Sequence, residues 1–193
     1  MLVEVALFGI TGARRTKIIQ ARKLLLATML VASTSVHAAT LSGTVVGVSD
    51  GDTITVLDAN REQHKIRVGG IDAPEKAQPF GQRSKGSLST LVFGKDGKRL
   101  DVQWSKRDRY RRIVGKVLVT DPTCQRQCPK TLDAGLAQVT AGLAWWYRKY
   151  AKEQSAEDAQ RYELAEQEAR SHRAGLWSDG QPMPPWDWRK AAR

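Results

Sequence analysis

The chain has 193 residues, a formal net charge of +11 at pH 7 and a hydrophobic fraction of 41%. Its glycine and proline content excludes a fibrous or low-complexity chain, and the apolar fraction excludes disorder throughout, so one domain with a single core is expected. The excess of positive charge favours a polyanionic partner, either nucleic acid or an anionic membrane surface, over a basic protein that is merely well solvated.

The first 38 residues differ in kind from the rest. Basic residues between Arg14 and Lys23 precede the apolar run Leu24–Val31, and small residues follow as far as Ala38. This order is typical of a signal peptide cleaved after Ala38, because the run is shorter than the ~20 apolar residues of a membrane-spanning helix. We therefore expect an exported protein, periplasmic or secreted. The remaining chain keeps 26 basic against 19 acidic residues, a formal charge of +7.

Three β-rich runs open the domain: Leu41–Val48, Thr53–Leu57 and His64–Val68. The turn Asp50-Gly51 joins the first two, and the polar stretch Asp58–Gln63 joins the next two, which predicts a three-stranded meander.

A helix is expected next, over Gln82–Phe93, because its apolar residues share one face and Gly94 follows in the position of a C-cap. Two further strands are predicted near Arg99–Trp104 and Ile113–Val119. Cys124 and Cys128 then lie in a proline-bounded loop, where an oxidising compartment favours a local disulfide. A zinc site would need two further ligands, and the histidines of the mature chain stand apart from one another.

Two more helices complete the predicted domain. The first carries an apolar stripe made by Leu132, Leu136, Val139 and Leu143. The second begins at the N-cap Ser155 and ends at Gly175.

Five strands with a helix between the third and fourth are the order of an OB-fold, a five-stranded Greek-key barrel. We therefore expect an α+β domain with three helices over residues 39–180. Residues 181–193 form a tail rich in proline and tryptophan, either an extended strap packed on the domain or a mobile end.

Two local motifs suggest other chemistry, but each lacks a feature that this chemistry requires. Gly47–Gly51 matches the G-x-S-x-G pattern of serine hydrolases, but a strand follows it where a helix is required. Asp50-Gly51-Asp52 opens like an EF-hand loop, yet Ile54 stands where a third oxygen ligand is needed.

Acidic and arginine side chains converge at one end of the predicted barrel. Asp52 leads into the second strand, and Arg67 lies near the end of the third. Asp72 and Glu75 follow that strand at once, and Arg112 begins the fifth. Two carboxylates with backbone carbonyls suit Ca²⁺ or Mg²⁺, a further carboxylate can deprotonate a water, and arginine forks suit phosphate oxygens. Together these are the parts for phosphodiester hydrolysis, although an aspartate at a turn alone is more often a hydrogen-bonding turn residue.

The stretches Val48–Thr53, Lys65–Glu75 and Asp108–Arg112, in that order and spacing, resemble the staphylococcal nuclease family. Gly142-Leu143-Ala144 and Gly175-Leu176-Trp177 resemble it too, so the likeness covers essentially the whole predicted domain. The resemblance implies an OB-fold and the Ca²⁺-dependent hydrolysis of DNA and RNA, single-stranded or unwound by preference, to 3′-phosphate ends.

The resemblance also implies roles for the acidic residues. Asp52 and Asp72 match the family's Ca²⁺-binding carboxylates, and the backbone carbonyl ligand falls at Ala73. Glu75 matches the carboxylate proposed in the family as the general base for the attacking water.

Arg67 and Arg112 match the family's arginines that bind the phosphate and stabilise the charge that builds on it. Arg111 stands where the family has a glycine before the second arginine, so Arg109 and Arg111 are alternatives to Arg112, which we prefer. Losing either matched arginine should affect rate more than fold, because such preorganised charge is usually the largest catalytic contribution.

Three tyrosines are candidates for binding substrate. Tyr147 and Tyr150 lie in a segment that resembles the one lining the family's nucleotide pocket, where base stacking tolerates any sequence. A packed helix end is an equal alternative for that segment. Tyr110 lies in the motif that precedes Arg112.

A non-catalytic nucleic-acid-binding module of the same fold is the competing hypothesis. Such modules are recognised by missing acids or arginines, and here all five side chains are present, which favours an enzyme. No predicted helix sets a basic face opposite a broad apolar one, so stable membrane association is not expected, and a monomer suffices.

Overall fold

The computed structural model describes residues 39–94 and 98–192. The chain divides into two units, one ending at Val36 and one beginning at His37, and the description that follows concerns the second. The predicted signal peptide, residues 1–38, lies outside the described residues. None of the helices in the described ranges has the length and apolar character that crossing a membrane requires.

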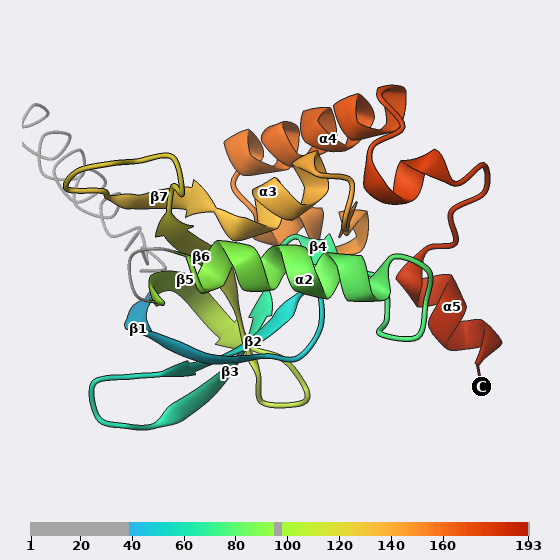
Figure 1. Ribbon diagram of the computed structural model, residues 1–193. Coiled ribbons are helices and arrows are strands. Elements are labelled where there is room, and N and C mark those ends of the chain that lie inside the picture. The colour runs from blue at the N-terminus through green and yellow to red at the C-terminus, as the bar shows by residue number, and fades with distance from the viewer. Residues whose placement is uncertain (1–38, 95–97, 193) are drawn as a thin grey trace, which may run out of the picture. The chain divides into compact units, whose positions relative to one another are not determined.

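Five strands close into a barrel (Figure 1). β1 pairs antiparallel with β2 and β5, β2 with β3, and β5 with β6, while β3 pairs in parallel with β6 and closes the barrel. This confirms the predicted OB-fold. The strands are β1 (Ala39–Val48), β2 (Thr53–Leu57), β3 (Gln63–Val68), β5 (Arg99–Arg107) and β6 (Ile113–Thr120).

The barrel closes around an aliphatic core because the strands alternate between inward apolar and outward polar residues. On β6 the odd-numbered positions Ile113, Gly115, Val117 and Val119 are buried, whereas the even-numbered positions are partly exposed. Ile54 and Ile66, which are register partners on β2 and β3, are fully buried as well.

Three shorter strands were not predicted. β7 (Lys130–Asp133) pairs with β6 at the edge of the sheet, and β4 (Ile71–Asp72) pairs with β8 (Trp145–Trp146). The second pair sets Asp72 opposite Trp145. It thereby brings the segment that follows β3 beside the segment that carries Tyr147, whose N–H donates to the Gly70 carbonyl at 2.8 Å.

The three predicted helices are present as α2 (Gly81–Val92), α3 (Ala134–Thr140) and α4 (Ala156–Ser171). Ser155 is the N-cap of α4, and its hydroxyl accepts from the Asp158 N–H at 3.0 Å. The C-cap of α2 is Phe93 and not Gly94, and α4 ends before a separate 3₁₀ helix, η2 (Gly175–Ser178). α2 contacts β1 and α3, and α3 packs on α4 (Figure 1).

The predicted apolar stripe does not match α3, because the helix begins later than predicted. Leu132 lies on β7, and the Asp133 carboxylate caps the helix by accepting the N–H groups of Gly135 and Leu136. The same carboxylate accepts the Tyr162 hydroxyl proton of α4 at 2.9 Å, and burial raises the pKa of Asp133. The face that α3 buries is therefore Ala134, Gly135, Gln138 and Val139.

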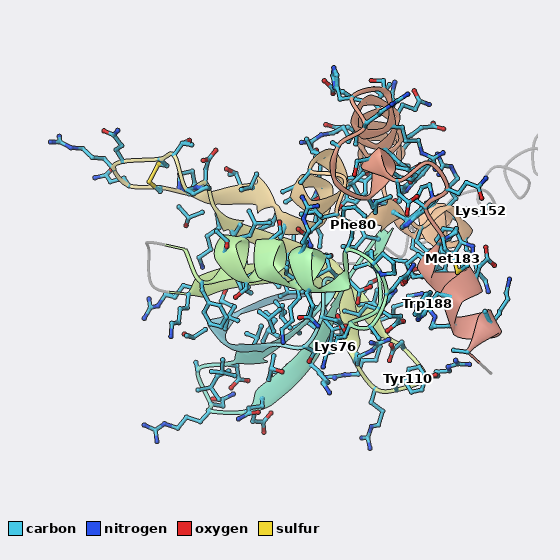
Figure 2. All side chains as sticks on the ribbon, turned by 45° about the vertical axis from the view of Figure 1, so that its right-hand side comes forward. Lys76, Phe80, Tyr110, Lys152, Met183 and Trp188 are labelled. Carbon is cyan, nitrogen blue, oxygen red and sulfur yellow. A yellow bond between two sulfur atoms is a disulfide. The ribbon has the colours of Figure 1, made fainter. Side chains whose placement is uncertain are left out.

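The tail is neither an extended strap nor a mobile end, the two alternatives that the sequence offered. Its proline-rich part leads into a fourth helix, α5 (Pro185–Ala191), with proline at the first helical position. Trp186 packs with a second apolar cluster formed by Trp145, Ala169, Leu176 and Trp177. Figure 2 brings this side of the molecule forward, with Met183 and Trp188 labelled on the segment. Cys124 and Cys128 form a disulfide in the loop before β7, with Cα atoms 5.7 Å apart.

The β2–β3 and β5–β6 hairpins share one turn geometry. In Asp58–Glu62 and Asp108–Arg112 the first N–H donates to the fifth carbonyl at 3.0 and 2.9 Å, and the fourth N–H donates to the first carbonyl at 3.2 and 2.9 Å. The fourth residues, Arg61 and Arg111, both have φ of 64°. A side chain in this left-handed region crowds its own backbone, and glycine does not.

Replacing Arg111 with glycine is therefore expected to raise the free energy of unfolding by about 0.5–1 kcal/mol, after the greater flexibility of the unfolded glycine chain is subtracted. Denaturant titration measures the change. Arg61→Gly is the matched variant in the other hairpin and should gain a similar amount. Two neutral or destabilising substitutions would contradict a strain-based account of both turns.

Candidate active site

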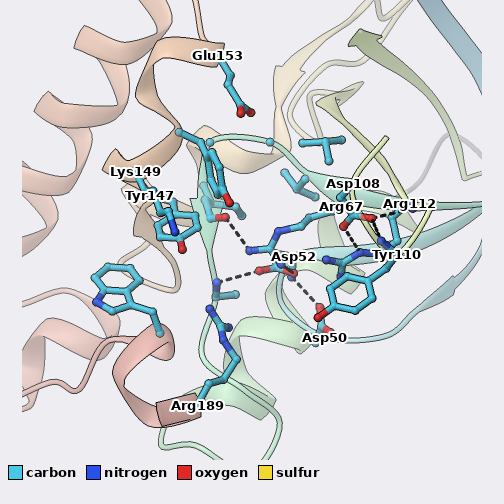
Figure 3. A pocket seen from close by; sticks show the side chains of 18 of the residues that line it. Asp50, Asp52, Arg67, Asp108, Tyr110, Arg112, Tyr147, Lys149, Glu153 and Arg189 are labelled. Atoms are coloured by element: carbon cyan, nitrogen blue, oxygen red, sulfur yellow. Dashed lines mark hydrogen bonds and ion pairs between the residues drawn. The ribbon is translucent and has the colours of Figure 1, made fainter. Parts of the chain in front are cut away.

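A pocket of about 760 Å³ opens at the end of the barrel where β2 begins and β3 ends (Figure 3). The β5–β6 hairpin, the 3₁₀ helix η1 (Arg148–Glu153) and α5 complete its walls. Asp72 has no exposed surface and lies beneath the lining. The predicted site residues that line the pocket are Asp52, Arg67, Ala73, Glu75, Tyr110, Arg112, Tyr147 and Tyr150.

The turn between β1 and β2 places Asp52. The Asp50 carboxylate accepts the Asp52 N–H at 3.1 Å, which tightens the turn. Gly51 passes so close to α2 that a Cβ there would lie 1.9 Å from the Ser84 hydroxyl and 2.7 Å from the Ala73 methyl. Glycine is therefore required to bring the start of β2 against α2 and the segment after β3.

The Asp52 carboxylate is buried, with 4% of the residue exposed. One oxygen accepts from Arg67 Nη1 and from the Thr53 hydroxyl, both at 2.9 Å, and the other accepts the Ala73 N–H at 3.0 Å. Burial raises the pKa of Asp52, and the charge of Arg67 opposes that rise. A nearby positive charge therefore stabilises the ionised form of this buried carboxylate.

Arg67 connects the two predicted metal-binding carboxylates. Its Nη1 donates to Asp52 at 2.9 Å and its Nη2 donates to Asp72 at 2.8 Å. Burial opposes the guanidinium charge, but the Asp52 and Asp72 carboxylates raise the pKa of Arg67 above its ordinary value. The group is therefore a fixed cation at the floor of the pocket.

The structure separates the three candidate arginines of the β5–β6 hairpin. Arg112 lines the pocket; its Nε donates to Asp108 at 2.8 Å and its Nη1 approaches the Thr53 hydroxyl at 3.5 Å, next to Asp52. Arg109 also lines the pocket, but its Nη2 donates to the hydroxyl of Tyr110, whose side chain is largely exposed, at 2.7 Å. Arg111 is not part of the lining. Arg112 is thus the guanidinium held beside the acidic residues.

The tyrosines form an aromatic wall. The rings of Tyr147 and Tyr150 meet edge to face with centroids 5.1 Å apart, and both line the pocket. Burial, followed by the Asp72 charge, raises the pKa of Tyr147. The guanidiniums of Arg109 and Arg112 lie 4.7 and 5.5 Å from the Tyr110 ring centroid.

Among the pocket residues that the sequence did not indicate, one meets the acidic floor. Arg189 of α5 reaches into it (Figure 3), and its Nη2 donates to Asp72 at 2.6 Å while its Nη1 donates to Glu75 at 2.7 Å. These hydrogen bonds, Asp72 first, raise the pKa of Arg189 against the effect of burial. No local pattern in the tail marks this arginine, because its partners lie 114 and 117 positions earlier.

The donor set at the pocket floor fits a hard divalent cation. Asp52, Asp72 and Glu75 supply carboxylate oxygens, the donors that Ca²⁺ and Mg²⁺ prefer, and nitrogen or sulfur donors of the kind zinc favours are missing from the lining. Two guanidiniums balance these three carboxylates in the structure. If Arg189 withdrew, two negative charges would be left without compensation, which matches one divalent cation.

A second acidic group lies elsewhere and serves the fold. Among residues 39–94 and 98–192, the carboxylates and imidazole whose ligand atoms lie within 4.8 Å of one another belong to Asp58, Glu62 and His64. Asp58 already accepts the N–H groups of Asn60 and Glu62 and contacts His64 Nε2 at 3.0 Å. These contacts show that the group stabilises the β2–β3 turn.

Comparison with known proteins gives the family. Residues 65–179 match the family of staphylococcal nuclease homologues. An uncharacterized endonuclease of Escherichia coli is 38% identical over 168 residues, covering 87% of this chain and 97% of the relative. A micrococcal nuclease of Shigella flexneri is 42% identical over 153 residues, covering 78% and 82%, and protein ParB of Escherichia coli is 40% identical over 165 residues, covering 86% and 87%. On the family match, the relatives and the barrel with its pocket, the chain belongs to the staphylococcal nuclease family.

Proposed function

We propose that this nuclease uses Ca²⁺ to hydrolyse phosphodiester bonds of DNA and RNA and leaves 3′-phosphate ends. Its family and the relatives named micrococcal nuclease and endonuclease support the hydrolysis of nucleic acid. One observation carries the finer proposal: two buried aspartates, a partly exposed glutamate and two arginines from separate elements come together around a single pocket.

Asp52, Asp72 and the main-chain carbonyl of Ala73 would hold the cation. When bound, Ca²⁺ supplies positive charge that polarises a phosphate oxygen and makes a nearby water more acidic. Burial of both aspartates limits competition from bulk water for their oxygens. The N–H of Ala73 fixes one Asp52 oxygen, so the two candidate ligands are held together by the fold itself.

Glu75 would act as general base. Its side chain is 39% exposed to the pocket, so a water can reach it. Glu75 takes a proton from the water whose oxygen attacks phosphorus, and the bond from phosphorus to the 5′-oxygen breaks, which leaves the phosphate on the 3′ side. Arg67 and Arg112 would donate to the phosphate oxygens and stabilise the charge that grows on them.

The aromatic wall would hold the bases. Stacking on Tyr147 and Tyr150 requires bases that are free of pairing, which supports single-stranded or unwound substrate, and Tyr110 at the rim offers a third ring. Lys106 and Lys149 add positive charge to the lining for the phosphates. We expect a monomer to suffice, because the residues proposed to hold the cation, the phosphate and the bases gather around one pocket.

The protein would act outside the cytoplasm. The predicted signal peptide and the Cys124–Cys128 disulfide both support export, because disulfides persist in oxidising compartments.

Digestion of single-stranded DNA by the chain lacking residues 1–38 tests the proposal. We expect cleavage with Ca²⁺, its loss on chelation and its return when Ca²⁺ is restored. The product ends should block a polymerase until a phosphatase removes the 3′-phosphate. Cleavage that survives chelation would contradict the cation, and tight binding without cleavage in Ca²⁺, Mg²⁺ or Mn²⁺ would identify a binding module.

A further inference from the structure

α5 occupies two parts of the pocket that substrate and cation would need. The segment before it is tied to the domain by Gln78, whose Nε2 donates to the Met183 carbonyl at 2.6 Å. Pro185 is buried, and Trp186 contacts Trp145 with ring centroids 5.6 Å apart. These contacts hold α5 at one side of the pocket, where Trp186, Arg189 and Lys190 form part of the lining (Figure 3).

The first occupied part is the carboxylate pair. Arg189 bonds both oxygens of Asp72, at 2.6 Å from Nη2 and 3.3 Å from Nη1, and also Glu75 Oε1 at 2.7 Å. Arg67 bonds the Asp72 oxygen that Arg189 shares, at 2.8 Å. Arg67 leaves Asp72 Oδ2 free, whereas Arg189 occupies it, so a divalent cation must compete with the Arg189 guanidinium for that oxygen and is repelled by its charge.

The second occupied part is the aromatic wall. The Trp186 ring lies parallel to the Tyr147 ring, with an interplanar angle of 14° and centroids 5.3 Å apart. This is the stacked arrangement that a nucleobase would adopt on the same face. Trp186 and Arg189 lie three positions apart on one helix, so both subsites are covered or freed together.

We propose that α5 is an autoinhibitory element in which Arg189 competes with the divalent cation for Asp72 and occupies the general base Glu75, while Trp186 covers Tyr147. The inference rests on the proposed function, because it takes Asp72 as a cation ligand and Glu75 as the base. It makes Arg189 the residue that sets how much cation the enzyme needs.

The physical basis is an equilibrium between a closed and an open helix. α5 has seven residues, too few to be stable as an isolated helix, so it persists only through its contacts with the rest of the domain. Arg189 is 40% exposed, which leaves it accessible to solvent when it moves away. If the open form is populated at a fraction f, the apparent dissociation constant for the cation rises by 1/f.

Ca²⁺ binding, measured by calorimetry on the chain lacking residues 1–38, tests the proposal without reliance on activity. Arg189→Ala is expected to bind Ca²⁺ about tenfold more tightly or better than the parent chain, as for an open fraction near one tenth. Lys190→Ala is the matched control: it removes one positive charge from the same helix and from the pocket lining, but the Lys190 side chain is largely exposed and pairs with Asp187 and not with the pocket acids. Its dissociation constant for Ca²⁺ should stay within about twofold of the parent value, since an exposed charge is well screened.

A second variant tests the other contact. Trp186→Ala keeps Arg189 and should also tighten Ca²⁺ binding, but by less than Arg189→Ala does. It should also tighten the binding of a short single-stranded oligonucleotide. Point variants are preferable to truncation, because removing α5 would expose the tryptophan cluster that Trp186 covers.

Three outcomes overturn the proposal in different ways. Unchanged or weaker Ca²⁺ binding by Arg189→Ala, in an enzyme that still needs Ca²⁺, removes the inhibitory role and leaves the nuclease proposal standing. Loss of cleavage at saturating Ca²⁺ would make Arg189 a substrate-binding arginine. A parent chain and variants that neither bind Ca²⁺ nor cleave would overturn both proposals.

Discussion

Replacing Arg112 with alanine is expected to lower kcat/KM for single-stranded DNA by about 10²–10³-fold, the range seen when one preorganised charge donor is removed from a transition state. The guanidinium lies beside Thr53 at the start of β2, so it can reach a phosphate bound over Asp52. The loss should not come from unfolding. The Asp108 pair that disappears is partly exposed and contributes about 0–1 kcal/mol.

Two neighbours in the same hairpin serve as controls. Arg109→Ala and Arg111→Ala remove the same charge, yet Arg109 points to Tyr110 and Arg111 is outside the lining. Neither variant should lose more than about fivefold in kcat/KM, the effect of weaker electrostatic steering of the substrate. Arg112→Lys keeps the charge and loses the fork, and it should remain strongly impaired. A larger loss in Arg109→Ala or Arg111→Ala than in Arg112→Ala would reassign the catalytic arginine.

The barrel could be predicted because its signals are local. Thr53–Leu57 has the bounds that its alternation and flanking turns predict, and the N-cap Ser155 marks the start of α4 correctly. Asp52 and Arg67 also converge as expected. They are near register partners on adjacent strands, where Thr53 pairs with Arg67.

Other elements escaped prediction because tertiary contacts decide them. β4 and β8 have two residues each and exist only through their mutual pairing. Leu132 fits a helical stripe with the leucine four positions later, but the Asp133 carboxylate is committed to capping α3 and to the Tyr162 hydroxyl. The helix therefore cannot start before Asp133, and Leu132 joins a strand.

α5 shows the same limit at the site itself. A helix of seven residues carries too little periodicity to be recognised, and its stability comes from packing and not from propensity. The sequence marked the tail only by its proline and tryptophan content, and nothing local specified that Arg189 would meet Asp72.

Changing Glu75 to glutamine is expected to lower kcat by about 10²–10⁴-fold, the usual contribution of a positioned general base. The amide has the shape of the carboxylate and cannot accept the proton of water. The fold should tolerate the change within about 0.5 kcal/mol, since the side chain is 39% exposed and the Glu75 N–H keeps its bond to Gln78.

Glu153→Gln separates proton transfer from the loss of a negative charge at the pocket. Glu153 also lines the pocket, with 36% of its side chain exposed, and pairs with Lys106 away from the acidic floor. Its glutamine variant should keep activity within a few-fold. Glu75→Gln also removes a partner of Arg189 and a negative charge beside the proposed cation, so kcat is compared at saturating Ca²⁺. A loss of kcat under that condition would belong to the proton-transfer step, whereas full activity would contradict Glu75 as the base.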